Sequence, residues 1–211
     1  MKRCDHCPSK PMAALTFDDG PSVHTVRILD TLEKYCVPAT FFVVGNRVEE
    51  GSGIIKRAFD MGNEIGNHSW THPNLTLNSL TPDEIKKELN DTSSALQSVT
   101  GVYPKVFRPP YGAVNETLKS ICTELNLPII NWSIDSFDWE CKNADIIYKN
   151  IFNKLHNHAI ILSHDFYDST ADAMERVIPE LISREYQLVT VSELMQHSGV
   201  ILEAGVVYNN G

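Results

Sequence analysis

No stretch of this 211-residue chain approaches the roughly 20 consecutive apolar residues that a transmembrane helix needs. The chain begins Met-Lys-Arg-Cys-Asp, which supplies basic residues but leads into no apolar run, so no export signal is visible. It also contains no Pro/Gly/Ser-rich linker, and no internal repeat is evident. These absences argue against a membrane-spanning protein and against two domains joined by a flexible segment.

Positive charge is in deficit, because 18 Lys and Arg residues stand against 27 Asp and Glu residues, for a net charge of −9. A surface of this sign repels polyanions, which argues against nucleic acid or an acidic membrane face as a partner. A neutral polymer or a small molecule fits the charge better. With 42% hydrophobic residues, the chain is long enough to bury one core and too short for two comfortable domains.

The 5 cysteines do not form the even, regularly spaced set of a disulfide framework. Cys4 and Cys7 have zinc-knuckle spacing, but no second pair of ligands follows at a matching spacing. We therefore favour two interpretations of this segment over a structural zinc site. It is either part of an N-terminal extension, residues 1–11, or the site of one local disulfide.

Short apolar runs alternate with amphipathic stretches along residues 12–211, which we take as a single domain. Apolar runs bounded by turn residues predict strands at 12–17, 39–44, 64–66, 106–108, 129–132, 159–163 and 187–190. Helical spacing and capping residues predict helices at 24–35, 54–61, 81–99, 114–125, 144–155, 171–184 and 192–197. This alternation predicts parallel strands with helices outside them.

An open doubly wound sheet and a barrel both fit this order of elements. Polar clusters follow many of the predicted strands. In a barrel such clusters all converge on one face, whereas in an open sheet they concentrate at the switch point. We therefore favour a barrel, complete or incomplete, over an open sheet.

Two of these clusters offer metal ligands. Asp18 and Asp19 end the first strand, and adjacent carboxylates can take different tasks, one binding a cation and the other acting as a base. His68 and His72, four residues apart, can share one metal ion, and Pro73 favours a loop here over a helix. Alone, Asp-Gly-Pro is ordinary turn chemistry and a His pair is often a surface pair. Together, at two strand ends, they predict a metal centre.

Three further clusters follow later strands. In RPPYG, at 108–112, the double proline fixes where Arg108 points, and DSFDW, at 135–139, places acids beside aromatic rings. In LSHD, at 162–165, His164 reaches a strand end as a candidate general acid or base. Each cluster alone is also compatible with a structural turn or a hydrogen-bonded histidine. Five clusters at successive strand ends predict one catalytic site.

In these residues the sequence resembles the polysaccharide deacetylases of carbohydrate esterase family 4, the NodB-homology domain. The resemblance covers about residues 12–197, and the five motifs occur in order as TFDDG at 16–20, HSWTH at 68–72, RPPYG at 108–112, DSFDW at 135–139 and LSH at 162–164. It implies an α/β fold, a single-domain distorted (β/α) barrel with about seven parallel strands. No catalytic position departs from the family pattern.

The resemblance also implies which residues hold a metal and which act as the base. Asp19, His68 and His72 would bind a divalent cation, with Zn²⁺ ahead of Co²⁺, Ni²⁺ and Mn²⁺. Asp18 would be the catalytic base, and Arg108 would tether it.

The remaining implied roles concern the substrate and the general acid. The Tyr111 backbone amide would help hold the oxyanion, and Tyr111 would also contact the substrate. Asp138 would orient His164, the general acid. Trp139 and Leu162 would line the pocket for the acetyl methyl group.

Together these roles describe a metal-dependent hydrolase that removes acetyl groups from a polysaccharide. We expect N-acetylglucosamine polymers as substrates, with peptidoglycan ahead of chitin oligosaccharides. The Tyr111-Gly112 version of the third motif and the ending around Leu188 look like those of bacterial cell-wall deacetylases. O-deacetylation of acetylxylan is the alternative, and a non-catalytic carbohydrate-binding domain is a third. We expect a monomer, outside the cell or at the cell wall if an export segment was removed, and cytoplasmic otherwise.

Overall fold

The computed structural model describes residues 9–77 and 79–211. Cys4 and Cys7 therefore lie outside the described residues, as does most of the extension expected at residues 1–11. Within the part of the chain that the structure describes, none of the helices combines the length and the apolar character that a bilayer span requires.

One buried strand organises a parallel sheet. Strand β1 (Met12–Asp18) is buried along its whole length and lies between β2 (Thr40–Val43) and β6 (Ala159–His164), both parallel to it. The other parallel pairs join β3 (Glu64–Asn67) to β2, β5 (Ile134–Asp135) to β6, β7 (Gln187–Leu188) to β1, and β4 (Ile129–Ile130) to β8 (Val207–Tyr208). Strands covered on both faces carry apolar residues at successive positions, which explains the continuous apolar runs in the sequence.

Phe107 links the two ends of this arrangement. It forms parallel bridges to Asn67 of β3 and to Ile129 of β4. The chain then continues from β4 into β5, which pairs with β6, so the strands form an irregular ring. The predicted α/β barrel fold is confirmed. The strand expected at 106–108 is reduced to one bridged residue, because the two prolines that follow have no amide N–H to continue a ladder.

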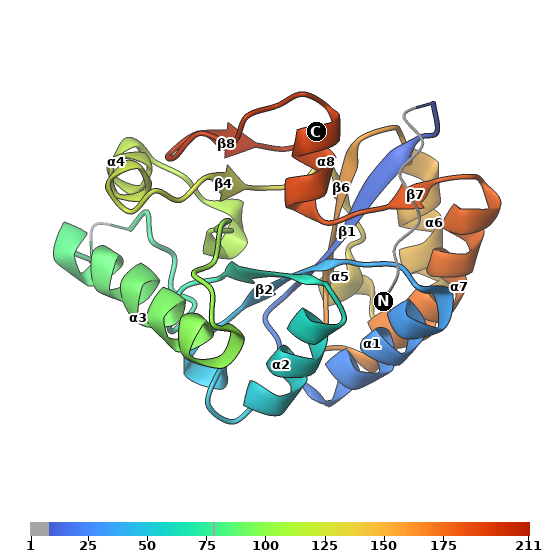
Figure 1. The fold of residues 1–211 in the computed structure, drawn as a ribbon, viewed down its shortest axis with the longest axis horizontal. Helices are drawn as coiled ribbons and strands as arrows, with labels where there is room; N and C mark the ends of the chain where they lie inside the picture. Colours follow the sequence, from blue (N-terminus) through green and yellow to red (C-terminus); the bar gives the residue numbers. More distant parts are fainter. Residues whose placement is uncertain (1–8, 78) are drawn as a thin grey trace.

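Helices surround the strands (Figure 1). They are α1 (Val23–Tyr35), α2 (Ser52–Asp60), α3 (Pro82–Thr100), α4 (Glu116–Glu124), α5 (Asp138–Cys141), α6 (Ala144–Lys154), α7 (Asp168–Ser183) and α8 (Val191–His197), with short 3₁₀ turns η1 (Gly45–Arg47) and η2 (Pro110–Gly112). The capping box predicted for α3 is present, since the Thr81 side chain accepts from the Glu84 amide while the Glu84 carboxylate accepts from the Thr81 amide at 2.7 Å. Helix α4 begins two residues later than expected because Asn115 caps it.

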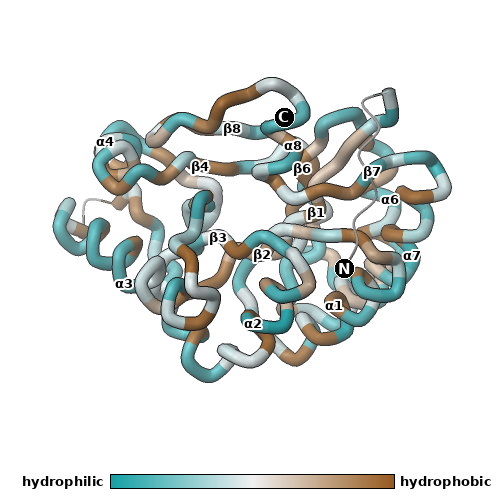
Figure 2. The backbone as a smooth tube through the Cα atoms, in the orientation of Figure 1, coloured by the Kyte–Doolittle hydropathy of each residue, from teal (hydrophilic) through white to brown (hydrophobic). Residues whose placement is uncertain are grey.

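Strand β1 divides the core into two layers, because successive side chains of a strand point to opposite faces. Ala13, Leu15 and Phe17 belong to the larger apolar cluster, which includes buried residues of α1, α6 and α7. Met12 and Ala14 belong to a second cluster with residues of β2, β4 and β6, inside the ring. Figure 2 shows the helices alternating between hydrophobic and hydrophilic colours along their length, as expected when one face packs on the sheet.

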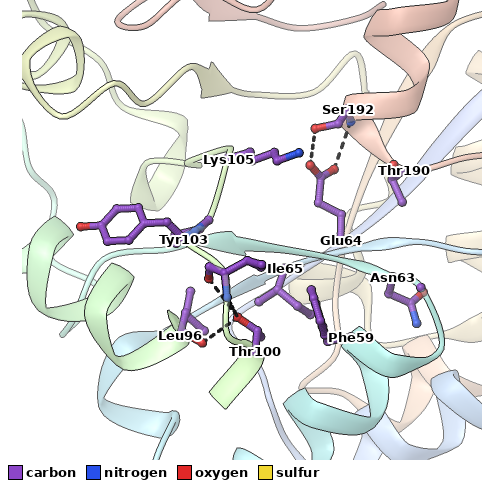
Figure 3. A pocket seen from close by; sticks show the side chains of 13 residues that line it. Phe59, Asn63, Glu64, Ile65, Leu96, Thr100, Tyr103, Lys105, Thr190 and Ser192 are labelled. Atoms are coloured by element: carbon purple, nitrogen blue, oxygen red, sulfur yellow. Dashed lines mark hydrogen bonds between the residues drawn. The ribbon is translucent and has the colours of Figure 1, made fainter. Parts of the chain in front are cut away.

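A pocket of about 330 Å³ lies at the start of β3, at the end of the strand opposite to the polar clusters (Figure 3). The acidic side chain in its wall is paired within the fold: the Glu64 carboxylate accepts from the Ser192 amide at 3.0 Å, from the Ser192 hydroxyl, and from Thr40 Oγ1 at 3.1 Å. In barrels the amino-terminal face of the strands serves stability, and this network anchors α8 to β2 and β3.

Candidate active site and metal centre

Polar side chains gather where the parallel strands end. Asp18, the last residue of β1, is paired in register with His164, the last residue of β6. Asp135 ends β5 opposite Leu162, and His68 directly follows β3. Because the strands are parallel, their carboxyl ends meet at one face, where all five sequence clusters come together.

A pocket of about 420 Å³ opens at this face and is lined by Asp18, Asp19, His68, His72, Tyr111, Trp132, Asp135, Trp139, Leu162, His164 and Tyr167. Of the predicted site residues, Arg108 and Asp138 do not line the wall; both are fully buried, and each supports a wall residue from behind. Sequence reasoning assigned no role to Trp132, Asp135 or Tyr167. Trp132 reads as part of an apolar strand, and Tyr167 follows the last motif with no signal of its own.

Asp19, His68 and His72 lie where they can bind one metal ion together. One ligand atom from each residue lies within 4.8 Å of the other two. Oδ1 of Asp19 is 3.2 Å from Nε2 of His72 and 3.5 Å from Nε2 of His68. This oxygen is buried and has no hydrogen-bond partner among the described residues, as expected for an atom directed at a cation. Two imidazoles and one carboxylate also match the donor set of catalytic zinc sites, so the residues present fit a metal.

The protonation of these three side chains also favours a cation. Nδ1 of His68 lies 2.7 Å from the Arg108 carbonyl oxygen, to which it donates, so Nε2 keeps its lone pair. Burial alone would raise the pKa of Asp19, but interactions with His68 and the other imidazoles lower it to about 2. Burial, together with the neighbouring His68, lowers the pKa of His72. Carboxylate and neutral imidazole are the forms that coordinate metals.

Four non-glycine residues in the three segments 16–20, 68–72 and 108–112 have left-handed backbone conformations. The φ angles are 73° at Asp19, 61° at Ser69, 59° at His72 and 61° at Tyr111. Non-glycine residues in this region are uncommon, and they persist where the surrounding contacts over-determine the backbone. The segment that contains both histidines is a loop, as the proline after it predicted.

Arg108 fixes the orientation of Asp18 from inside the barrel. Its Nη1 donates to Asp18 Oδ1 at 2.8 Å and to Thr16 Oγ1 at 2.7 Å. Its Nε and Nη2 donate to the carbonyl oxygens of Ile130 and Asn131, at 3.0 and 2.9 Å. Burial lowers the pKa of Arg108, while the Asp18 charge and hydrogen bond oppose that effect. With Oδ1 held in this way, the other carboxylate oxygen of Asp18, Oδ2, lies 3.7 Å from Nε2 of His68.

Asp138 holds His164 through two contacts. Its Oδ1 is 2.7 Å from His164 Nδ1, and its Oδ2 accepts from the His164 amide at 2.7 Å and from Thr170 Oγ1 at 2.7 Å. Burial alone lowers the pKa of His164, but the hydrogen bond and charge of Asp138, with two nearby aspartates, raise it to about 9. The imidazole is therefore protonated at neutral pH, and its Nε2–H is available to donate a proton.

Aromatic side chains border the pocket. Tyr111 is 68% exposed and its ring centre is 4.9 Å from that of His72, while Trp139 is 46% exposed. Leu162 is buried at the pocket wall. Aromatic rings beside a polar pocket suit contact with a sugar ring. The oxyanion role of the Tyr111 amide stays a prediction.

Residues 5–130 match the family model described as polysaccharide deacetylase. The chain belongs to the polysaccharide deacetylase family. This membership confirms the resemblance noted in the five motifs and the predicted enzyme class, a hydrolase.

Two curated relatives and one solved structure show how similar this member of the polysaccharide deacetylase family is to others. It is 43% identical over 182 residues to the peptidoglycan-N-acetylglucosamine deacetylase PgdA of Listeria monocytogenes, covering 86% of this chain and 38% of PgdA. It is 42% identical over 188 residues to the peptidoglycan-N-acetylmuramic acid deacetylase PdaC of Bacillus subtilis, covering 89% of this chain and 39% of PdaC. A family 4 acetyl xylan esterase from Clostridium thermocellum, in complex with a cobalt ion, superposes with a TM-score of 0.87 at 38% identity. The match covers 94% of this chain and 98% of the esterase chain.

Proposed function

We propose that this chain is a metal-dependent deacetylase that removes N-acetyl groups from N-acetylglucosamine units in peptidoglycan or in chitin-type oligomers. One observation carries the proposal: three metal ligands, a carboxylate fixed by Arg108 and an imidazole fixed by Asp138 converge on one pocket. The likeness to PgdA and PdaC supports peptidoglycan as the polymer, although the chain spans only 38% and 39% of their lengths.

A divalent cation held by Asp19, His68 and His72 would polarise the acetyl carbonyl group and lower the pKa of water beside it. Two imidazoles and one carboxylate suit Zn²⁺ best, and Co²⁺, Ni²⁺ or Mn²⁺ would accept the same ligands. The cobalt ion in the related acetyl xylan esterase structure supports a divalent cation in this family.

The protein's own side chains would move the protons. Asp18 accepts the proton of the attacking water, while Arg108 keeps its carboxylate oriented. His164 donates a proton to the departing nitrogen, which leaves as an amine, and Asp138 holds the ring protonated. The Tyr111 amide donates to the developing oxyanion, a contact that is typically worth about 3 kcal/mol.

O-deacetylation of acetylxylan is the second candidate, because the same residues can cleave an acetyl ester. The structural likeness to the Clostridium thermocellum acetyl xylan esterase favours it. An ester releases an alcohol, which needs less help from a general acid than an amine does. The two candidates therefore differ in how strongly turnover depends on His164.

Acetate release from three polymers tests the proposed function. We expect release from N-acetylglucosamine oligomers and from peptidoglycan glycan strands, and less from acetylated xylan. The measurement is acetate produced per enzyme per minute, with an Asp18→Asn variant as the inactive control. Release from xylan alone would replace the amidase proposal with the esterase one, and release from none of them would favour a carbohydrate-binding role.

Asp138→Asn should shift the alkaline limb of the pH profile to lower pH. The Asp138 charge raises the pKa of His164, so the protonated imidazole is present below that pKa and is lost as the pH rises through it. Removing the charge lowers the pKa, and the loss of activity then begins at lower pH. The measurement is kcat/KM for acetate release across a pH range that brackets the His164 pKa of about 9. If the alkaline limb did not move, it would not report the loss of the proton from His164.

A further inference from the structure

The loop between the two histidine ligands is held on one side by η1. The carbonyl oxygen of Ser69 accepts from the Gly45 amide at 2.9 Å, and that of Trp70 accepts from the Asn46 amide at 3.0 Å. The amide of Ser69 donates to the side chain of Asn67 at 2.8 Å, which in turn donates to the α3 backbone. These contacts leave the amides of the next two residues to be bound from another direction.

Glu88 of α3 binds both of them. Its Oε2 accepts from the Trp70 amide at 2.8 Å and from the Thr71 amide at 2.7 Å, and its Oε1 accepts from Thr71 Oγ1 at 2.7 Å. These three hydrogen bonds of 2.7–2.8 Å to one side chain hold the loop at two successive residues. None of the motifs in the sequence includes Glu88, and it does not line the pocket.

We propose that Glu88 is a positioning residue for the metal centre, acting through the backbone of the loop that it binds. This inference rests on the proposed function, because it assumes that the two histidines bind a cation. The loop has left-handed residues at Ser69 and His72, and such a backbone persists only where contacts hold it. Glu88 supplies those contacts next to His72, on the side that η1 does not reach.

Variants of Glu88 separate the effect of side-chain length from the effect of charge. Glu88→Gln keeps the length and one carbonyl acceptor for the two amides, while its NH₂ group can still meet the Thr71 hydroxyl. Glu88→Asp keeps the charge but is one methylene shorter, so it cannot span the same gap. Glu88→Ala removes both. A positioning role therefore predicts that the longer, neutral variant retains the site better than the shorter, charged one.

Glu84 provides a matched control. It lies one helical turn earlier on α3 and closes the capping box with Thr81, so Glu84→Ala weakens the helix without touching the loop. A merely structural effect on α3 would appear in both alanine variants as a lower melting temperature. A positioning effect would appear only in the Glu88 variants, as a loss of metal affinity.

The experiment measures Zn²⁺ affinity by competition with a chromogenic chelator, and the visible absorption of the Co²⁺-loaded proteins as a report of ligand geometry. We expect Glu88→Ala to weaken Zn²⁺ binding by about 10- to 100-fold, the range for residues that support metal ligands. Glu88→Asp should weaken it and alter the Co²⁺ spectrum, whereas Glu88→Gln and Glu84→Ala should stay near the original protein.

The other outcomes either overturn the proposal or move the decision to a second comparison. Unchanged affinity in Glu88→Ala and Glu88→Asp would remove any positioning role. A larger loss in Glu88→Gln than in Glu88→Asp would assign the effect to charge and not to the reach of the side chain. If Glu88→Ala does not fold, the comparison of Asp with Gln decides. If the unaltered chain binds no metal, the proposed function fails first, and the inference falls with it.

Discussion

His164→Ala is expected to lose acetate release by about 100- to 10,000-fold while keeping its metal, because general acid catalysis typically contributes a factor of that size. The reason lies in the leaving group. An amide nitrogen departs only when it is protonated, and His164 is the protonated side chain at the pocket wall whose ring Asp138 holds at 2.7 Å. Its side chain is hydrogen-bonded to Asp138, which is not one of the three metal ligands, so the loss should be in turnover and not in metal content.

The measurement pairs steady-state kinetics with the metal content of the purified protein. His156→Ala is the matched control, because that ring does not line the pocket and its Nδ1 lies 2.9 Å from the nearby Lys154 carbonyl oxygen. Near-normal kcat in His164→Ala would disprove the acid assignment. A variant without metal would instead show that His164 supports the metal centre. On acetylated xylan the same variant should lose less, since an alcohol is an easier leaving group.

Arg108→Met should lower the free energy of unfolding by about 3–5 kcal/mol, the usual effect of removing one partner from a buried ion pair. Arg108 is 0% exposed and the Asp18 carboxylate it neutralises is 3% exposed. Without the guanidinium, Asp18 would be left as an unpaired charge in the barrel interior. The hydroxyl of Thr16 and the carbonyl oxygens of Ile130 and Asn131 would also lose their donor.

Urea unfolding of both proteins at the same pH gives this difference. Arg176→Met is the control, because that side chain is 53% exposed and pairs with Asp145 at the surface, where an ion pair contributes at most about 1 kcal/mol. If Arg108→Met lowered the free energy of unfolding by no more than Arg176→Met does, the buried ion pair would not contribute appreciably to stability. The prediction also implies that activity and stability cannot be separated at this position.

Local sequence signals predicted those site residues that stand close together in one short motif. The Asp18-Asp19 pair, the histidine pair and Arg108 each stand in a compact motif at the end of an apolar run, so both residue type and strand end were visible. The start of α3 was visible for the same reason, since a capping box is a local pattern.

What the sequence did not predict depends on contacts between distant segments. Strands β5 and β8 have two residues each, too few for a periodic signal, and they exist only because β6 and β4 supply partners. Tyr167 reaches the pocket because β6 carries it there. Glu88 contacts the histidine loop across 17 residues of chain, from a helix whose pattern reports only its apolar face.

Removing and restoring the metal is the most direct test of the central claim, that one cation bound by Asp19, His68 and His72 drives deacetylation. The protein is stripped with a chelator and assayed for acetate release from N-acetylglucosamine oligomers, with and without added Zn²⁺ or Co²⁺, beside a His72→Ala variant treated in the same way. We predict that the stripped protein is inactive, that either ion restores release, and that the variant is restored by neither. Full activity in the stripped protein, or equal restoration in His72→Ala, would contradict the claim.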